Sequence, residues 1–238
     1  MNKSEPIYGN RPALNEPQVY RMKLKKPQIC TWVLTICTLL VLLSTPLTAQ
    51  RFSAGIVGGL NASQIDGDML AGFDKVGLMC GIKAIVNFES RFALNIEFLY
   101  TQRGSKPDIF APEYDPNINI FLHYAELPVY VSLGDWWQEE GEYYKVSAQA
   151  GLSYGRLISA RTVDYFHPSE SSYDLLVPYF NQNDLSWLVG VGYQINSHFG
   201  FSGRYTREII PLLSPKKNNL LNERLTSYYL TLRLEYYF

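Results

Sequence analysis

The sequence predicts an all-β fold, an eight-stranded antiparallel up-and-down transmembrane β-barrel. From Phe52 to the C-terminus, apolar and polar residues alternate with a period of two, which is the pattern of strands that have one apolar face. The connections between these segments alternate between short and long. The last segment is apolar at six alternate positions and ends on Phe238.

Composition narrows the class of protein. The chain has 238 residues, of which 47% are hydrophobic, 14% aromatic and 18% charged. This balance excludes a disordered, collagen-like or nucleic-acid-coating chain. A mean hydropathy of -0.11 is too polar for a membrane protein that is built from many helices.

The only long apolar run, residues 29–43, has the features of a secretory signal. Three lysines within residues 23–26 precede it, and a helix-breaking proline and small residues ending at Ala49 follow it. The run is shorter than the roughly 20 residues that a membrane-spanning helix needs. We therefore assign residues 22–49 to a signal peptide and residues 50–238 to the barrel domain.

Residues 1–21 are polar, contain three prolines and show no apolar periodicity. We expect a non-translated or disordered extension here, with translation starting at Met22. The alternative is an unusually long basic region of the signal itself.

Removal of the signal changes the charge and the cysteine content. Six of the 21 basic and two of the 22 acidic residues lie before residue 50, which leaves 15 basic and 20 acidic residues and a net charge of -5. This balance disfavours nucleic acid as a partner. Only Cys80 remains, so neither an internal disulfide nor a cysteine-based metal site is expected.

The final segment is the clearest strand. Its apolar face ends flush with the chain, and this resembles the C-terminal signal by which the assembly machinery recognises outer-membrane barrels. A lipid-facing row bounded by aromatic residues is also what a membrane strand requires physically, although a soluble sandwich strand would alternate in the same way. The expected assembly signal is Tyr228, Leu230, Leu232, Leu234, Tyr236 and Phe238.

Seven further segments follow the same rule and bring the count to eight, an even number as in single-chain bacterial barrels. The apolar faces of the second to seventh strands include Val76, Leu78 and Ile82; Phe92, Ile96 and Phe98; Leu127, Val129 and Val131; Tyr144, Val146 and Leu152; Trp187, Val189 and Val191; and Phe199, Phe201 and Tyr205. The expected strand ranges are 51–62, 75–88, 91–104, 118–133, 142–155, 185–195, 199–206 and 225–238.

The connections sort by length. If both termini are periplasmic, every long connection falls on the outer side, which is the membrane-barrel pattern of short periplasmic turns and long external loops. A soluble lipocalin-like barrel has no reason to sort its loops in this way. The short or moderate connections are 89–90, 134–141 and 196–198, and the long ones are 63–74, 105–117, 156–184 and 207–224.

The charges on the strands share the face opposite to the apolar one. An eight-stranded barrel is just wide enough for side chains to fill it, so we expect these charges to pair inside the lumen as a plug. A proton or ion path through them is the alternative. The expected lumen cluster is Lys83, Arg91, Glu97, Arg103, Glu126, Lys145, Arg204, Arg233 and Glu235.

Five segments together carry a family resemblance: GGLNASQIDGD at 58–68, AGFDKVG at 71–77, YAELP at 124–128, GVGY at 190–193, and RY at 204–205. They resemble the PorT-like outer-membrane β-barrel proteins of Gram-negative bacteria. The resemblance implies the barrel fold and a place in the cell envelope. For some members it also implies a role in a protein-secretion apparatus that is coupled to gliding.

Candidate groups for chemistry are few. His123, His167 and His198 fall on the fourth strand, the third external loop and a periplasmic turn, so they cannot converge on one metal. His123 has the position of a histidine in an outer-membrane lipid hydrolase or acyltransferase, but Ala125 stands where a serine would be needed. The histidine could equally be satisfied by lipid headgroups.

Two features of the expected external loops could bind a ligand. Asp66, Asp68 and Asp74 could bind Ca²⁺, but we favour an ordinary Asp/Gly turn because the remaining calcium ligands are missing. The third loop is rich in aromatic residues, which could bind a partner or a glycan, or could pack over the barrel mouth. These aromatic residues are Tyr165, Phe166, Tyr173, Tyr179 and Phe180.

The sequence therefore predicts an integral outer-membrane barrel with a plugged polar lumen and a structural or binding role through its external loops. We expect no catalytic residues, no cofactor and no metal. The expected partners are outer-membrane lipid, the barrel-assembly machinery and an envelope protein that contacts the external loops. The alternatives are a subunit of a protein-secretion apparatus, a lipid-modifying enzyme and a soluble lipocalin-like carrier.

Overall fold

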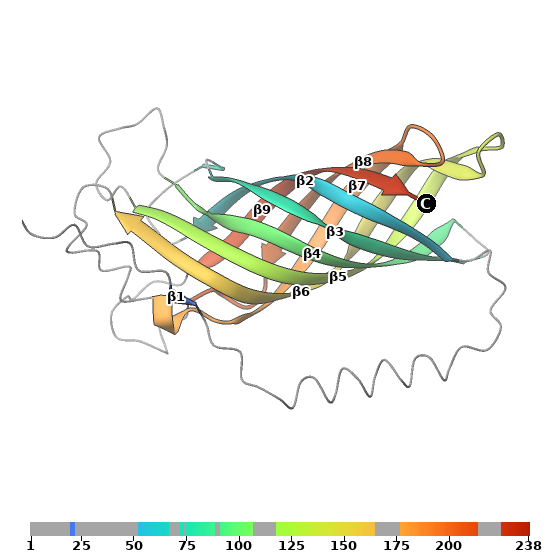
Figure 1. The fold of residues 1–238 in the computed structure, drawn as a ribbon. Coiled ribbons are helices and arrows are strands. Elements are labelled where there is room, and N and C mark those ends of the chain that lie inside the picture. The colour runs from blue at the N-terminus through green and yellow to red at the C-terminus, as the bar shows by residue number, and fades with distance from the viewer. Residues whose placement is uncertain are drawn as a thin grey trace, which may run out of the picture.

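Eight antiparallel strands close into a barrel in the computed structural model of the chain (Figure 1). Each strand pairs with its neighbours in the chain, and pairing of the first barrel strand with the last closes the ring. This is the predicted up-and-down topology. The strands are β2 (Phe52–Asp66), β3 (Lys75–Asn87), β4 (Phe92–Ser105), β5 (Ile118–Gln138), β6 (Tyr143–Asp164), β7 (Asn183–Gln194), β8 (Phe199–Glu208) and β9 (Thr226–Tyr237).

Two short elements accompany the barrel. The two-residue strand β1 (Tyr20–Arg21) pairs with β6, and the 3-10 turn η2 (Val177–Tyr179) precedes β7. Among the described residues, no helix is long and apolar enough to cross a membrane. The structure describes residues 20–21, 52–66, 72–73, 75–88, 91–106, 118–164, 177–213 and 225–238, so the expected signal peptide at 22–49 lies outside them.

All eight predicted strands are present, but several are longer than predicted. β5 runs to Gln138 and β6 to Asp164, because the two strands continue to pair with each other beyond their other neighbours at both ends. A register shift between His123 and Tyr124 marks where the outer part of this hairpin begins. The third long connection therefore starts at residue 165 and not at 156.

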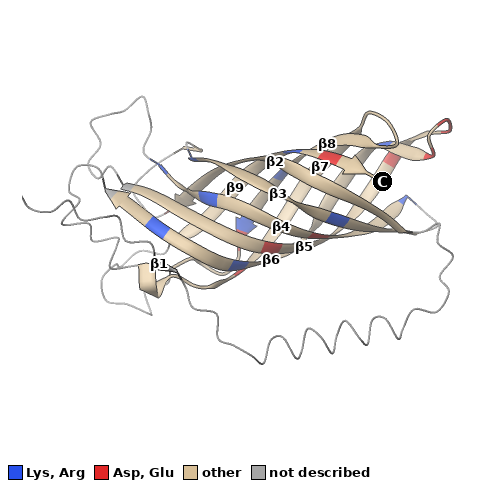
Figure 2. Ribbon diagram, in the orientation of Figure 1, with Lys and Arg blue, Asp and Glu red and all other residues tan. Residues whose placement is uncertain are grey.

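The two ends of the barrel differ. One end, here called the turn end, carries the short connections 88–91, 139–142 and 195–198 together with the C-terminus (Figure 1). The other end, here called the loop end, carries the four long connections. Acidic residues are prominent in the β5–β6 turn, whereas basic residues lie on β6 toward the loop end (Figure 2).

The outward face of the barrel is apolar across its middle. Leu232, Leu234 and Val191 are 73%, 69% and 64% exposed, which fits a wall that contacts lipid and not water. Aromatic residues flank this apolar belt at its loop-end edge and at its turn-end edge, as the interfacial girdles of membrane barrels do. Toward the loop end they are Tyr100, Tyr154, Trp187, Tyr205 and Tyr228, and toward the turn end Phe52, Phe88, Phe92, Phe199 and Tyr236.

Candidate functional site

The inward side chains of the strands form the most elaborate polar arrangement in the described part of the chain. Alternation along each strand points every second side chain into the barrel. Many of these side chains are polar or charged, although Val57, Met79 and Leu99 form a small apolar cluster among them. Two groups of buried charges result, followed by an apolar layer toward the loop end. We describe these layers from the turn end to the loop end.

A vestibule opens at the turn end. It is a cavity of about 470 Å³ whose walls carry amides and hydroxyls, among them Asn95, Ser132 and Gln149. Lys83 lies at its inner limit, and its amine is 2.7 Å from a carboxylate oxygen of Glu235. Solvent can therefore enter the barrel from this end as far as the first group of charges.

The first group of charges, the Glu97 cluster, contains Lys83, Glu97, Arg204, Arg233 and Glu235. Glu97 accepts from Arg204 at 3.1 Å and from Arg233 at 2.7 Å. Arg233 also lies 2.8 Å from Glu235, so it bridges the two carboxylates. All five residues are at most 5% exposed, and charges this buried persist only when they are paired in this way.

Tyrosine hydroxyls complete the Glu97 cluster. Tyr130 donates to Glu97 at 2.6 Å, and Tyr237 donates to Glu235 at 2.6 Å. The Arg204 guanidinium lies 4.3 Å from the centre of the Tyr130 ring, within the range of a cation–π contact. Three cations thus share two carboxylates and two phenols in a hydrogen-bonded network.

The second group, the Arg103 cluster, has the opposite balance and contains Arg103, Glu126, Asp184 and Glu208. The Arg103 guanidinium forms ion pairs with Glu126, with Asp184 at 2.8 Å and with Glu208 at 3.7 Å. It lies between two rings, 4.5 Å from that of Tyr124 and 4.2 Å from that of Tyr229. One cation therefore faces three buried carboxylates.

Neutral donors support the carboxylates around Arg103. Tyr229 donates to Glu126 at 3.0 Å, and Ser186 donates to Asp184 at 2.9 Å. The backbone amide of Ser227 donates to Glu208 at 2.9 Å. Between the two clusters lies a cavity of only about 10 Å³, roughly the space of a single water.

An apolar layer, here called the mouth cluster, follows at the loop end. It combines inward residues at the ends of several strands with residues of η2 and of the segments that follow β8 and precede β9. All of them are at most 4% exposed, so this layer excludes water. The mouth cluster is Ile65, Ile120, Leu122, Tyr124, Leu157, Ala160, Val177, Phe180, Leu212, Leu213 and Leu225.

Two predicted members of the lumen cluster lie elsewhere. Arg91 precedes β4, and its side chain is 62% exposed in an ion pair of 2.9 Å with Asp135 at the rim of the turn end. Lys145 lies over the rings of Trp136 and Tyr193 on the outer wall. Both predictions were wrong, the first because Arg91 belongs to a turn and not to a strand.

The position of Lys145 has a local backbone cause. Trp136 has a φ of 61°, in the left-handed region, and the β5–β6 ladder skips the Trp136–Lys145 pair. The inward–outward alternation of side chains is therefore broken at the Trp136–Lys145 position. Tyr144 was predicted to face lipid, but it packs against Gly134 at the vestibule.

Sequence reasoning missed Asp184 and Glu208. The predicted strands started at residue 185 and ended at 206, so both carboxylates were assigned to loops. Extending the alternation by one inward position would have found them, because Asp184 continues the face of Ser186, and Glu208 that of Thr206.

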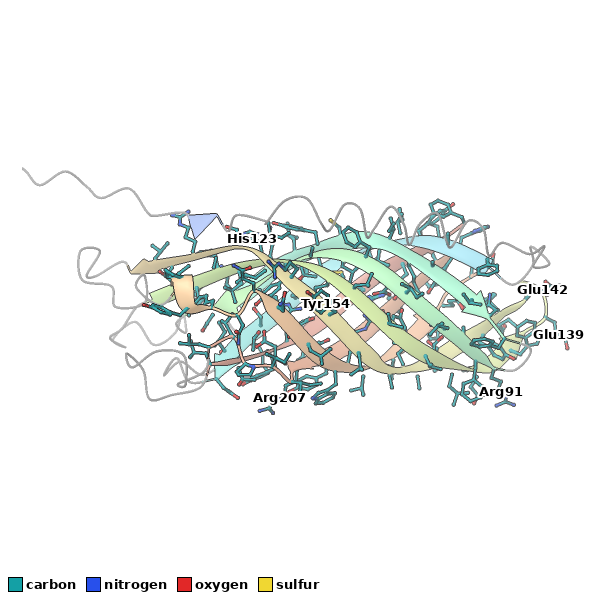
Figure 3. The ribbon with its side chains drawn as sticks, turned by 90° about the horizontal axis from the view of Figure 1, so that it is seen from below. Arg91, His123, Glu139, Glu142, Tyr154 and Arg207 are labelled. Atoms are coloured by element: carbon teal, nitrogen blue, oxygen red, sulfur yellow. The ribbon has the colours of Figure 1, made fainter. Side chains whose placement is uncertain are left out.

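The candidate residues for chemistry are dispersed. Nδ1 of His123 is 2.6 Å from the Tyr100 hydroxyl on the outer wall, while His198 contacts the backbone of Tyr237 at the turn end. Figure 3 shows His123 toward the loop end, far along the barrel from Arg91 at the turn end. No group of three or more potential metal ligands occurs in the part of the chain that the structure describes.

The features proposed for the external loops are described only in part. Asp66 forms an ion pair of 3.7 Å with Arg207, and Asp68 and Asp74 lie outside the described residues. Phe180 is buried in the mouth cluster, whereas Tyr179 is 45% exposed. Tyr165, Phe166, Tyr173 and His167 lie outside the described residues.

Comparison with solved structures finds other outer-membrane barrels. Ail of Yersinia pestis, in complex with the heparin analogue sucrose octasulfate, is 15% identical, with 79% of this chain and 99% of Ail covered and a TM-score of 0.42. Neisserial surface protein A is 13% identical, with 78% of this chain and 96% of that protein covered and a TM-score of 0.43. OprG of Pseudomonas aeruginosa is 13% identical, with 79% of this chain and 94% of OprG covered and a TM-score of 0.32.

The family comparison is more direct. No curated protein matches the chain. The model of the outer membrane protein beta-barrel domain matches residues 45–214, which is more than half of the chain and includes β2 to β8. Its description agrees with the apolar outer wall and the closed ring of strands. The chain belongs to the outer membrane protein beta-barrel domain family, and its location is the outer membrane.

Proposed function

We propose that this outer-membrane barrel has a plugged polar lumen and acts as a structural or binding protein through its external face. The observation that carries the proposal is the order of layers inside the barrel. The Glu97 and Arg103 clusters leave a gap of about 10 Å³ between them, and the mouth cluster lies beyond. A hydrated solute that enters the vestibule would have to break buried ion pairs and then cross an apolar layer.

A solute-uptake assay tests the plugged lumen. The protein, reconstituted in liposomes, should give no faster swelling in arabinose than protein-free liposomes do. A trimeric general porin serves as the positive control. Swelling that increases with the amount of reconstituted barrel would contradict the proposal.

A binding role is supported by apolar residues exposed at the loop end, which is the external end by the rule of short periplasmic turns. Tyr179, Ile158 and Ile210 are 45%, 44% and 40% exposed. The backbone of Asn181 bonds to that of Leu212, so the segments that carry Tyr179 and Ile210 lie side by side. Exposed apolar groups that lie together are a common feature of protein interfaces.

Cross-linking on intact cells tests the binding role. The variants Tyr179→Ser and Ile210→Ser should lose a cross-linked species that the wild-type protein forms. Ile195→Ser is the matched control, because Ile195 is 53% exposed in the turn between β7 and β8 at the periplasmic end. Equal loss in all three variants, or in none, would contradict an interface at the loop end.

The PorT-like resemblance supports a more specific version, in which the bound partner is part of a protein-secretion apparatus. A complex that survives detergent extraction and contains a secretion component would favour it. Normal protein secretion in a strain that lacks the barrel would argue against it.

A lipid-modifying enzyme is the second candidate, and one observation favours it. Ser159 is the cross-strand partner of His123 on the outer wall. Against it, His123 Nδ1 is already engaged by the Tyr100 hydroxyl, which would hold the imidazole in a structural role. We therefore propose that the protein is not an enzyme. Lipid A from cells expressing His123→Ala should be unchanged by mass spectrometry, and an altered lipid would reverse this choice.

A further inference from the structure

The outer wall of the barrel carries a group of cations just below the loop end. Lys75 opens β3, Arg161 lies on the outer part of β6, and Lys106 directly follows β4. None of the three forms an ion pair within the described part of the chain. Gly104 pairs with Phe121 and Ser105 with Ile120 across the β4–β5 ladder, so Lys106 lies just beyond these pairs at the same end of the barrel.

Strand register brings Lys75 and Arg161 to the same aromatic residue. The Lys75 amine lies 3.3 Å from the centre of the Phe121 ring. Phe121 pairs across the ladder with Arg161, and such partners have Cβ atoms about 4.5–5.5 Å apart. The two cations therefore flank one ring on the outer wall.

Gly104 makes this approach possible. It is the β4 partner of Phe121, and its φ of 150° is suited to glycine. With no side chain between β3 and β5, the Lys75 side chain can cross β4 and reach the ring. Across the wall, Lys75, Gly104, Phe121 and Arg161 therefore follow one another, and the Phe121 ring lies between the two cations.

The Arg161 guanidinium has unused hydrogen-bonding capacity. Its Nε is buried and has no hydrogen-bond partner in the described part of the chain. A buried donor without a partner is costly, so a ligand that accepts from it would stabilise this arrangement. An anionic acceptor is favoured, because the lysine amines and the guanidinium carry positive charge and present only donors.

The position of these cations on the outer wall indicates that the anion is part of a lipid. Tyr100 and His123, one row nearer the apolar belt, are hydrogen-bonded at 2.6 Å and are typical of the aromatic level at a membrane interface. The cations therefore lie at the height of the lipid headgroups in the external leaflet. Arginine and lysine at this height are the usual ligands of lipid phosphate.

We propose that Lys75, Lys106 and Arg161 form a binding site for the phosphate monoester headgroup of an external-leaflet lipid. Phe121 forms the floor of the site, and the acyl chains run down the apolar wall formed by β4 and β5. This site is independent of the binding surface at Tyr179 and Ile210. It anchors lipid to one side of the barrel and involves no chemical step.

Native mass spectrometry of the protein purified from outer membranes tests the site. The probes are phosphatidic acid, whose headgroup is a phosphate monoester, and diacylglycerol with the same chains. We expect bound phosphatidic acid and no comparable diacylglycerol adduct. Each of Lys75→Gln and Arg161→Gln should weaken phosphatidic acid binding about fivefold, which corresponds to about 1 kcal/mol per cation near a lipid surface.

Arg207→Gln is the matched control. Arg207 lies on the outer face at the same end of the barrel, elsewhere around the ring (Figure 3), but Asp66 already pairs with it. Its variant should bind phosphatidic acid as the wild type does. Lys75→Arg should retain binding, and a heat-dependent gel shift shows that each variant is folded.

Three results would overturn the proposal. One is equal binding of diacylglycerol and phosphatidic acid. Another is an equal loss in the Arg207→Gln variant, which would indicate attraction by net charge alone. The third is displacement of phosphatidic acid by inorganic phosphate at an equal concentration, which would identify free phosphate, and not a lipid, as the ligand.

Discussion

At the scale of single residues, Arg103 is the single cation that pairs with three buried acidic side chains in the described part of the barrel. Its guanidinium is the only cation among three buried carboxylates in the Arg103 cluster, and it is held between the rings of Tyr124 and Tyr229. A buried ion pair adds little to stability over an apolar pair, but removal of one partner leaves an uncompensated buried charge. The same argument applies to Glu97, because its removal would leave three buried cations with one carboxylate.

Replacement of Arg103 by methionine should therefore be strongly destabilising. We expect the free energy of unfolding to fall by about 3–5 kcal/mol, as for other broken buried pairs. Urea unfolding in phospholipid vesicles, followed by tryptophan fluorescence, measures the change.

The control for this measurement is Arg91→Met. The pair of Arg91 with Asp135 is exposed, so the loss should be less than about 1 kcal/mol. Equal effects of the two substitutions would mean that the Arg103 cluster is solvated and does not depend on its arginine.

The sequence could locate most of these residues, because a period of two assigns each strand residue to a face. Lys83, Glu97, Arg103 and Glu126 lie inside the barrel, as do three further predicted residues, Arg204, Arg233 and Glu235. Lys145 could not be placed in this way, since the left-handed Trp136 breaks the alternation. Asp184 and Glu208 were missed because the predicted strands stopped one inward position short of them, and strand ends are set by pairing with a neighbouring strand.

At the scale of elements, the contact between β4 and β5 depends on one glycine. A Cβ atom at Gly104 would lie 1.8 Å from the carbonyl oxygen of Ile120, and the φ of 150° is one that residues with a side chain rarely adopt. A side chain here must therefore move the backbone of both strands.

Gly104→Ala should destabilise the barrel by about 1–3 kcal/mol from backbone strain alone. Gly58→Ala is the matched control on another strand, because a Cβ atom there meets nothing within 4 Å. That variant should stay within about 0.5 kcal/mol of wild type. If the two variants unfold at the same urea concentration, Gly104 is not a point of close approach between β4 and β5.

The C-terminal strand offers a second prediction for an element. Phe238 is 74% exposed, and its ring contacts that of Tyr236, while its backbone amide donates to Ala54 at 2.9 Å. If this strand is the signal for assembly, Phe238→Ser should lower the amount of folded barrel in outer membranes severalfold, measured by the heat-dependent gel shift.

Phe52→Ser is the comparison, because Phe52 is 51% exposed at the same end of the barrel, on β2. It removes a similar lipid contact outside the C-terminal strand. A comparable fall in both variants would assign the effect to lipid anchoring and not to recognition of the C-terminus.

The elements show where sequence patterns were insufficient. The strands were predictable because each has one apolar face, and their order follows from the short turns. The mouth cluster was not predictable, since residues such as Val177, Phe180 and Leu212 belong to connections without periodicity. Their burial depends on which strand ends they meet, and this is a property of the closed barrel.

At the scale of the whole molecule, the barrel is asymmetric along its axis. A water-accessible vestibule opens at the turn end, charged clusters lie in the middle, and an apolar cluster lies at the loop end. The outer wall is asymmetric too, with acidic residues in the β5–β6 turn and basic residues toward the loops (Figure 2). This arrangement is consistent with the proposed binding role at the loop end.

The most direct test of this account is the electrical conductance of the purified barrel in a planar lipid bilayer. If the paired charges and the mouth cluster plug the lumen, as proposed, the barrel should give no stable unitary currents at moderate voltage. Folding of the barrel is verified independently by the heat-dependent gel shift of the same protein preparation. Regular current steps of uniform size from folded barrels would contradict the plugged lumen and would make the charged clusters the lining of a channel.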